Sequence, residues 1–492
     1  MEPEKQVDNR MGTAPVGRLM LSVGAPIVLS MMLQAAYNIV DSAYLANMRE
    51  GGEEALTALG LAFPIQLLMV AVAVGTDVGT NALLSKSLGQ RDRQKASRTA
   101  GNAIFMGLVI SVVFLIFGLA GVPAYVNSQN AGGSISETAL LMSMDYLRIC
   151  CCVSFGIVFF SVYEKILQAT GRSLYSTIAQ ITGAVVNIVM DPIMIYGWLG
   201  CPEMGVKGAA WATVLGQIVS AGMVFYFHGK LDREVDKSPR FLKPQGRILK
   251  EIYQIGLPAI ISQALLTVMT YGLNLILGRI PQVGENAVTV YGLYCKIQQM
   301  IIFAAVGVRD TITPIVSFNY GMRSRRRIQE GIRWGMLFTA VLMLLGLVGI
   351  ELLAEPLTRF FSLSDVTYDI CVDCIRVVSL GFLFAGICIA FQGVFQALEC
   401  GLESLLISLG RQVVFILPVA WCITRFITGA ENVSLVWWTF LIGEGLTLLC
   451  ALFMYARVIH KNSADWRSKH ESHHHHRPGI RQRRKDHRQN DG

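Results

Sequence analysis

The feature that most limits how this chain can fold is a series of twelve apolar runs that fill nearly all of its length. The runs lie at about residues 19–45, 56–84, 99–122, 138–168, 173–199, 206–228, 252–279, 286–318, 331–354, 367–397, 402–426 and 433–458. A bilayer core about 30 Å thick is crossed by about 20 apolar residues in a helix. Only 15% of the residues are charged, against about 25% in an average soluble domain. The sequence therefore predicts an all-α integral membrane protein with twelve transmembrane helices.

Positive charge is concentrated in alternate loops between these runs. The basic loops contain Lys86, Arg91, Arg93, Lys95 and Arg98, then Lys230, Arg233, Lys237, Arg240, Lys243 and Arg247, then Arg323, Arg325, Arg326 and Arg327. Loops rich in lysine and arginine stay on the cytoplasmic side. We therefore expect a multi-pass protein of the plasma membrane with both termini in the cytoplasm. Since this topology explains the net charge of +8, we expect no nucleic-acid partner.

The second half of the chain repeats the first half at a shift of 232 residues. The matched positions include Pro26 with Pro258, Ser30 with Ser262, Ala55 with Ala287, Gly60 with Gly292, Gln66 with Gln298, Gly75 with Gly307, Ser85 with Ser317 and Gly89 with Gly321. Each repeat contains six predicted helices, an even number, so both halves have the same topology. The repeat predicts two six-helix bundles related by a pseudo-twofold axis along the membrane normal, with a substrate site between them.

The repeat also divides the chain into five segments. We expect a cytoplasmic N-terminal tail at 1–15, an N-terminal six-helix bundle at 16–228, a cytoplasmic linker at 229–250, a C-terminal six-helix bundle at 251–460 and a disordered basic cytoplasmic tail at 461–492. The run His473–His476 is expected to be part of this solvated tail. Two bundles that rock against each other expose a shared site to each side of the membrane in turn, so this plan predicts transport by alternating access.

Two short motifs place carboxylates inside predicted helices, where ionisable groups are costly and are functional by default. The motifs Tyr37-Asn38-Ile39-Val40-Asp41 and Asn187-Ile188-Val189-Met190-Asp191 each gather polar groups on one helix face. Two carboxylates that meet at one depth need a proton or a bridging cation, and amide and hydroxyl oxygens suit a hard ion. We predict a site for H⁺ or Na⁺ formed by Asp41, Asn187, Asp191 and Thr213, with Tyr37 and Asn38 in support.

The alternative interpretation of these residues is a structural cluster that packs helices through hydrogen bonds. The second repeat lacks the carboxylates, because Asp41 aligns with Leu273. The predicted ion site therefore lies in the N-terminal half only.

Other charges within the apolar runs permit weaker predictions. Asp77 aligns with Arg309 under the repeat, and we hypothesise that the two form an ion pair across the pseudo-twofold axis. Glu164, Lys165 and Arg411 lie near predicted cytoplasmic helix ends, where long side chains extend to the water interface. No role follows from the sequence for Asp310 or Glu444.

A substrate cavity between the bundles is expected to have both polar and adaptable side chains in its wall. Methionine side chains are flexible and fit varied ligands, and glutamine supplies both a donor and an acceptor. The predicted cavity residues are Gln34, Gln263, Met269, Gln392 and Gln396.

A set of motifs across residues 11–460 resembles the multidrug and toxic compound extrusion (MATE) family of transporters. In the first half the motifs are Pro26, Tyr37–Asp41, Gly171-Arg172, Gly183, Asn187–Pro192, Gly205-Val206, Gly208–Thr213 and Gln217. In the second half they are Gly256-Leu257-Pro258, Pro314–Gly321, Gln392–Ala397, Arg411-Gln412 and Pro418. The resemblance implies two six-helix lobes and antiport of small organic, cationic compounds with H⁺ or Na⁺. It also implies a cation site at Asp41, Asn187, Asp191 and Thr213.

The chain is similar to the DinF-like or MepA-like branch of that family, because its seventh and tenth helices lack the acidic residues of another branch. Asp77 stands where the family pattern has a small residue, and Glu399-Cys400 replaces a small, flexible junction. These departures bear on substrate range and leave the expected fold unchanged.

Two other function classes compete with drug efflux. A flippase for a lipid-linked sugar or cell-wall precursor would share the two-lobe plan, and a strongly cationic cavity would favour it, because such substrates carry phosphates. A membrane enzyme is not expected, because the sequence has no metal-ligand cluster, nucleophile elbow or P-loop. We expect a monomer that uses no cofactor besides the coupling ion, binds no metal, and contacts only membrane lipid and a small-molecule substrate.

Overall fold

The computed structural model describes residues 10–46, 48, 52–129, 136–360, 365–427 and 430–475, and the regular structure in these ranges is entirely helical. The helices are α1 (Arg10–Thr13), α2 (Val16–Ala46), α3 (Gly52–Gly89), α4 (Arg93–Ile116), α5 (Val122–Gln129), α6 (Glu137–Cys152), α7 (Phe155–Ala169), α8 (Ser173–Ile195), α9 (Val206–Leu231), α10 (Gly246–Leu277), α11 (Gly284–Gly321), α12 (Arg325–Phe360), α13 (Asp365–Ser379), α14 (Phe382–Ala397), α15 (Gly401–Leu409), α16 (Ile416–Thr424) and α17 (Trp438–His475). Short π-helical turns at Phe117–Gly121 and Gly410–Val414 join α4 to α5 and α15 to α16.

The predicted all-α membrane architecture with twelve spans is confirmed. In the described ranges, ten segments are long and apolar enough to cross a bilayer. Two further pairs, α6 with α7 and α13 with α14, pass the same test together and are bent by 45° and 49°. The two bent pairs are the fourth and tenth spans, so they occupy the same place in each repeat.

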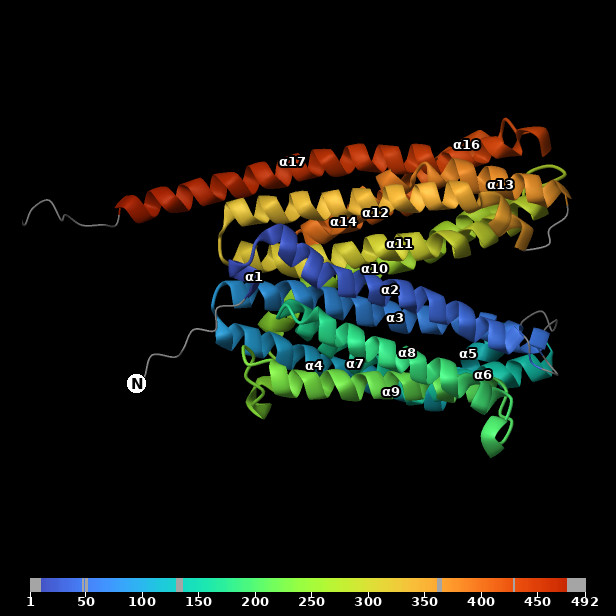
Figure 1. Cartoon of the computed structure of the whole chain (residues 1–492), viewed down its shortest axis with the longest axis horizontal. Helices are drawn as coiled ribbons and strands as arrows, with labels where there is room; N and C mark the ends of the chain where they lie inside the picture. Colours follow the sequence, from blue (N-terminus) through green and yellow to red (C-terminus); the bar gives the residue numbers. More distant parts are fainter. Residues whose placement is uncertain are drawn as a thin grey trace, which may run out of the picture.

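The helices form two bundles that lie side by side, with their long axes roughly parallel (Figure 1). The blue-to-green helices α2–α9 make one bundle, and the yellow-to-red helices α10–α17 make the other. The links from α3 to α4, α9 to α10 and α11 to α12, which carry the predicted basic loops, lie at one end of the molecule (Figure 1). The start of α1 and the end of α17 lie at the same end, which we call the basic end.

Contacts between the bundles obey the predicted twofold relationship. Helix α2 packs on α11, and its repeat mate α10 packs on α3, while α3 and α11 contact each other directly. A methyl group on Gly89 would overlap the carbonyl oxygen of Phe318, and one on Gly321 would overlap that of Lys86. Phe318 is the repeat mate of Lys86, and Gly321 is the repeat mate of Gly89, so the two contacts are equivalent under the repeat. Glycine is required at both places because backbones touch there.

A second pair of equivalent contacts lies further along α3 and α11, away from the basic end. Gly75 lies against Ile260, and Gly307 lies against Val28, which is the repeat mate of Ile260. At these two aligned pairs, Gly75 with Gly307 and Gly89 with Gly321, the absence of a side chain lets α3 and α11 approach helices of the opposite bundle.

The basic end is closed by packing between the bundles. Met20, Val23 and Ile27 of α2 belong to one buried apolar cluster with Ile312 and Ile315 of α11. At the surface of this end, the Lys86 ammonium lies 2.6 Å from the Glu399 carboxylate of the opposite bundle. These contacts leave the space between the bundles sealed on this side.

The boundaries differ from the expected ones at two places. The link between the bundles spans Asp232–Gln245, with one 3₁₀ turn at Pro239–Leu242, because α9 and α10 extend further than the apolar runs. The last helix continues to His475, beyond the expected boundary at 460. Residues 476–492 and most of the predicted N-terminal tail lie outside the described part of the chain.

Candidate functional site

A cavity of about 390 Å³ lies between the two bundles and is lined by side chains from both. Its wall includes all five residues that the sequence suggested, namely Gln34, Gln263, Met269, Gln392 and Gln396. Aromatic rings of Phe160, Phe303, Tyr294, Phe382 and Phe440 also line it. The fold places these five residues on the wall of one cavity. Their role in substrate binding remains a prediction.

The predicted ion site lies partly on this wall. Asn187 and Asp191 share a face of α8, where Asn187 Nδ2 donates to Asp191 Oδ1 over 3.4 Å, and both residues are buried. Asn187 and Thr213 of α9 both line the cavity. The side chains of Tyr37, Asn38 and Asp41 lie outside the described residues, so their part in the site remains a prediction.

Small residues bring α8 and α9 close enough for this site to form. A methyl group on Gly216 of α9 would lie 2.6 Å from the carbonyl oxygen of Gly183 on α8 and 3.2 Å from Asn187 Cβ. Small residues at facing positions let helix backbones approach closely within a membrane. Thr213, one turn before Gly216, is thereby held beside the Asn187 face of α8.

Helix α8 is also attached to α2 around Pro26, which lies inside α2. Ser173 Oγ donates to the Val23 carbonyl oxygen over 2.8 Å, and Thr177 Oγ1 donates to the Pro26 carbonyl oxygen over 2.9 Å. One turn on, Ser30 donates to the Gln180 side chain. A proline removes one backbone donor from its helix, and hydroxyls of the neighbouring helix supply donors to carbonyls of this segment.

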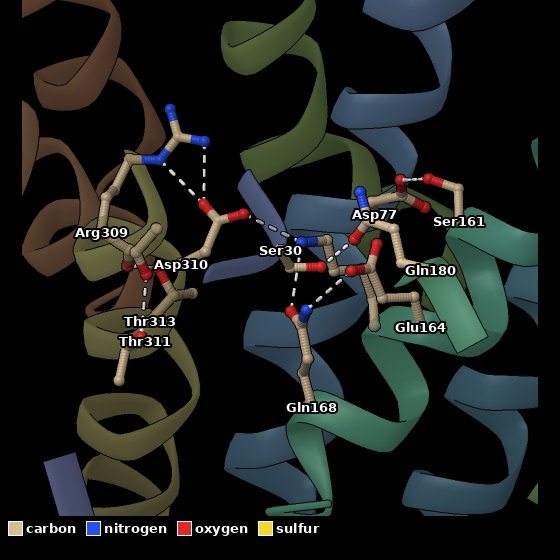
Figure 2. A network of polar contacts seen from close by, with 12 residues as sticks. Ser30, Asp77, Ser161, Glu164, Gln168, Gln180, Arg309, Asp310, Thr311 and Thr313 are labelled. Atoms are coloured by element: carbon tan, nitrogen blue, oxygen red, sulfur yellow. Dashed lines mark hydrogen bonds and ion pairs between the residues drawn. The ribbon is translucent and has the colours of Figure 1, made fainter. Parts of the chain in front are cut away.

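A network of charged and amide groups lies on the part of the cavity wall nearest the basic end, which we call the cavity floor. Figure 2 shows the contacts within this network. Lys165 Nζ of α7 lies 2.9 Å from Asp310 Oδ2 of α11 and donates to Gln168 Oε1 over 3.1 Å. Gln168 donates in turn to Glu164 Oε1 over 3.1 Å. Arg309 donates twice to Asp310 Oδ1, over 3.0 and 2.8 Å.

The hypothesised pair between Asp77 and Arg309 is wrong. Asp77 accepts a hydrogen bond from Ser161 of α7, within its own bundle, whereas Arg309 binds the neighbouring Asp310. The charge that crosses between the bundles at the cavity floor is Lys165, because α7 rather than α3 presents its side chain to Asp310.

The expectation that Glu164, Lys165 and Arg411 extend to the water interface is also wrong. Glu164 and Lys165 are buried, with 5% and 7% of their surface exposed. Arg411 donates to both carboxylate oxygens of Glu444, the shortest over 2.8 Å. Lys165 and Arg411 have oppositely charged partners on other helices, Asp310 and Glu444, and Glu164 accepts from Gln168 one turn along its own helix. None of the three therefore needs to reach water, and Glu444 has its role as the partner of Arg411.

Several buried oxygen atoms on the cavity wall have no hydrogen-bond partner among the described residues. They are Asp77 Oδ1, Asn187 Oδ1, Thr213 Oγ1, Tyr294 Oη, Gln396 Oε1 and Gln412 Oε1. Four of the six can only accept a hydrogen bond, and the two hydroxyls can accept or donate one. Buried polar atoms are normally satisfied, so the wall is suited to an occupant that donates hydrogen bonds or carries positive charge.

The charged residues on the described wall are of both signs. Asp77, Glu164, Asp310 and Glu444 are acidic, and Lys165, Arg309 and Arg411 are basic. This wall is not strongly cationic, so the property that would favour a phosphate-bearing lipid substrate is missing from the described cavity.

Sequence reasoning missed Ser161, Gln168 and Gln180 as members of these networks. It named Gln412 in the motif Arg411-Gln412 but not as a cavity residue, and Gln168 lies one turn from Glu164 and Lys165. Ser161 carried no signal, because a lone serine in an apolar run is common.

Comparisons with known proteins place the chain among transporters. The family model described as MatE matches residues 26–193 and 258–422. The two matched segments begin 232 residues apart, which is the shift of the internal repeat.

Relatives match over almost the full length of the chain. The multidrug export protein MepA of Staphylococcus aureus is 23% identical over 443 residues, which cover 90% of this chain and 94% of that protein. MepA of Staphylococcus saprophyticus is 23% identical over 436 residues, 88% of this chain and 92% of that protein.

Solved structures share the fold. An outward-facing structure of a multidrug resistance MATE family transporter superposes with a TM-score of 0.85 at 24% identity, covering 94% of this chain and 100% of that one. A transporter of the MOP superfamily from Pyrococcus furiosus, described as having a binding pocket of reversed polarity, gives a TM-score of 0.83 at 25% identity over 92% of this chain and 99% of that chain.

Proposed function

Because the chain belongs to the MatE family, we propose that it exports small organic cations from the cell by antiport with H⁺ or Na⁺. The single observation that most supports this proposal is the cavity between the bundles, whose buried oxygen atoms without partners among the described residues can all accept a hydrogen bond. A cationic compound that carries N–H groups would satisfy those acceptors, and the aromatic rings on the wall would contact its apolar body.

Alternating access follows from the arrangement of the bundles. The basic end is sealed by backbone contact at Gly89 and Gly321, and the positive-inside bias makes that end cytoplasmic. We therefore assign the closed side to the cytoplasm and place both termini there, in the plasma membrane. Rocking about α3 and α11 would open the floor and expose the cavity to the cytoplasm.

The coupling ion is proposed to bind at Asn187, Asp191 and Thr213 together with Asp41. Asn187 Oδ1 and Thr213 Oγ1 have no partner among the described residues, and they lie beside a buried carboxylate. Oxygen donors around a carboxylate suit either a proton or Na⁺. Exchange follows if the ion and the organic cation favour opposite states of the two bundles.

The test is uptake of ethidium, a fluorescent organic cation, into proteoliposomes that contain the purified full-length protein. A pH gradient and a Na⁺ gradient are imposed separately, and a neutral dye of similar size serves as the substrate control. We expect uptake of ethidium with one of the two gradients, and its loss in Asp191→Asn and Asp41→Asn. Asp369→Asn, which alters an exposed carboxylate on α13, should keep wild-type uptake. Well-folded wild type that moves ethidium with neither gradient would contradict the proposal.

A further inference from the structure

The charges at the cavity floor do not balance. Asp77, Glu164 and Asp310 are acidic, whereas Lys165 and Arg309 are basic. Both cations donate to Asp310. Asp310 therefore binds both basic side chains, and the carboxylates of Asp77 and Glu164 accept hydrogen bonds from neutral donors.

Each of those two carboxylates has a neutral donor in its own bundle. Asp77 accepts from the Ser161 hydroxyl, and Glu164 accepts from the Gln168 amide. A neutral donor stabilises a buried carboxylate less than a cation does. One negative charge at the floor therefore has no positive partner among these residues.

Asp77 also presents a free oxygen to the cavity. Only 2% of its surface is exposed, its Oδ1 atom has no hydrogen-bond partner among the described residues, and the residue lines the cavity. A carboxylate oxygen can only accept. A donor that enters through the cavity would therefore satisfy this oxygen.

The surroundings define what kind of donor fits. Val74, one turn before Asp77 on α3, and Val78, the residue after it, line the cavity together with Phe160 and Ala259. A hydrated inorganic cation would lie against apolar walls there. An ammonium group attached to an apolar body would instead place its charge on the carboxylates and its carbon atoms on the walls.

We propose that Asp77 and Glu164 form a binding subsite for the protonated amine of the transported compound, in which Asp77 Oδ1 accepts an N–H bond and Glu164 supplies the second negative charge. The proposal rests on the proposed function and adds a chemical preference to it. Primary, secondary and tertiary ammonium groups carry an N–H donor, whereas quaternary ammonium groups carry the same charge without one. The subsite should therefore discriminate between two cations of equal charge.

This subsite is separate from the predicted coupling site. Asp77 and Glu164 lie on α3 and α7 at the cavity floor, while Asn187 and Asp191 lie on α8, and Asn187 is about two turns beyond Gln180, the α8 residue nearest the floor network (Figure 2). The coupling ion and the substrate amine would thus have different carboxylates.

The experiment uses the purified full-length protein in nanodiscs and two probes, dansylamidopropyl-dimethylamine, which is protonated at neutral pH, and its N-methylated quaternary salt. Binding is measured by dansyl fluorescence. Wild type should bind the tertiary ammonium about tenfold more tightly, the effect of one charged hydrogen bond. Asp77→Asn should bind the two probes within about twofold of each other, and Asp77→Glu should restore the preference.

Glu164→Gln provides a second, different readout. It should weaken both probes alike and leave the preference intact, because Glu164 contributes charge and not the hydrogen bond. Asp369→Asn should change neither affinity. Size-exclusion profiles and thermal midpoints show that each variant is folded.

Three results would overturn the subsite. The first is wild type that binds both probes equally, and the second is wild type that binds neither. The third is Asp77→Asn that keeps the preference, which would mean that the extra methyl group acts by its size or that Asp77 holds a proton permanently. Ethidium uptake is measured on the same variants. Uptake that persists in any of these cases would leave the antiport proposal standing and remove only the subsite.

Discussion

Lys165 and Asp310 join the two bundles across the cavity floor, with the ammonium 2.9 Å from the carboxylate and only 8% and 10% of the two side chains exposed. Each residue has another oppositely charged residue beside it in its own bundle. Asp310 accepts from Arg309, and Lys165 is joined to Glu164 through the Gln168 amide. The pair can therefore separate when the bundles move, because neither charge is then left alone in a medium of low dielectric constant.

Removal of one member of this pair should disturb the closed state. Asp310→Asn leaves Lys165 and Arg309 without their shared acceptor, and removing one partner of a buried pair costs about 3–5 kcal/mol. We expect at least a tenfold loss of ethidium uptake and faster amide hydrogen exchange at the ends of α3 and α11. Lys165→Arg, which keeps the charge, should keep most of the uptake. Wild-type exchange rates in Asp310→Asn would show that the pair does not hold the floor closed.

Thr213 should affect ion binding without affecting stability. Its Oγ1 atom has no partner among the described residues, so Thr213→Val removes no hydrogen bond and keeps the shape of the side chain. We expect an unchanged thermal midpoint and a half-saturating concentration of the coupling ion about tenfold higher than in wild type, the effect of one lost ligand. The control is Thr182→Val on α8, where the hydroxyl donates to the Ile178 carbonyl oxygen of its own helix. An unchanged half-saturating ion concentration in Thr213→Val would remove Thr213 from the site.

The pair Arg411–Glu444 should stabilise the second bundle only as a pair. Arg411→Met leaves the Glu444 carboxylate buried without a cation, which should cost about 3–5 kcal/mol and lower the thermal midpoint. Replacing both, in Arg411→Met with Glu444→Leu, should recover most of that loss, because hydrophobic residues of similar volume often replace a buried pair at little cost. A double variant no more stable than Arg411→Met would mean that the charges serve something other than each other.

Glu399 combines backbone strain with an ion pair. It has a positive φ of 61°, which glycine adopts more readily, and the corresponding junction of the first bundle has Gly171 with a φ of 80°. Its carboxylate binds Lys86 of the other bundle, although both side chains are partly exposed. We expect Glu399→Gly to be more stable than Glu399→Ala by about 1–2 kcal/mol, the strain of a left-handed non-glycine residue, as measured by thermal unfolding.

The ion pair of Glu399 should appear in dynamics and not in stability, because partly exposed pairs contribute only about 0–1 kcal/mol. In Glu399→Gly we expect faster hydrogen exchange around Lys86 and Phe318. Exchange equal to that of wild type would show that the glycine contacts close the basic end without help from this pair.

The sequence alone predicted the membrane spans, the duplication and the location of polar groups along each helix. Span length and loop charge are properties of consecutive residues, and the positions of Asn187 and Asp191 four residues apart put them on one face of any helix. The repeat also identified Gly89 and Gly321 as equivalent positions, and they make the same backbone contact in opposite directions.

The tertiary structure decided which charges meet. Sequence alignment paired Asp77 with Arg309, yet Asp77 binds Ser161 and the pair that crosses the cavity floor is Lys165 with Asp310. A repeat specifies which positions are equivalent, but the partner of a side chain depends on how far each helix is rotated about its own axis and on which neighbour it packs against. Those rotations are determined by the packing of whole helix faces, which the local pattern of one helix does not contain.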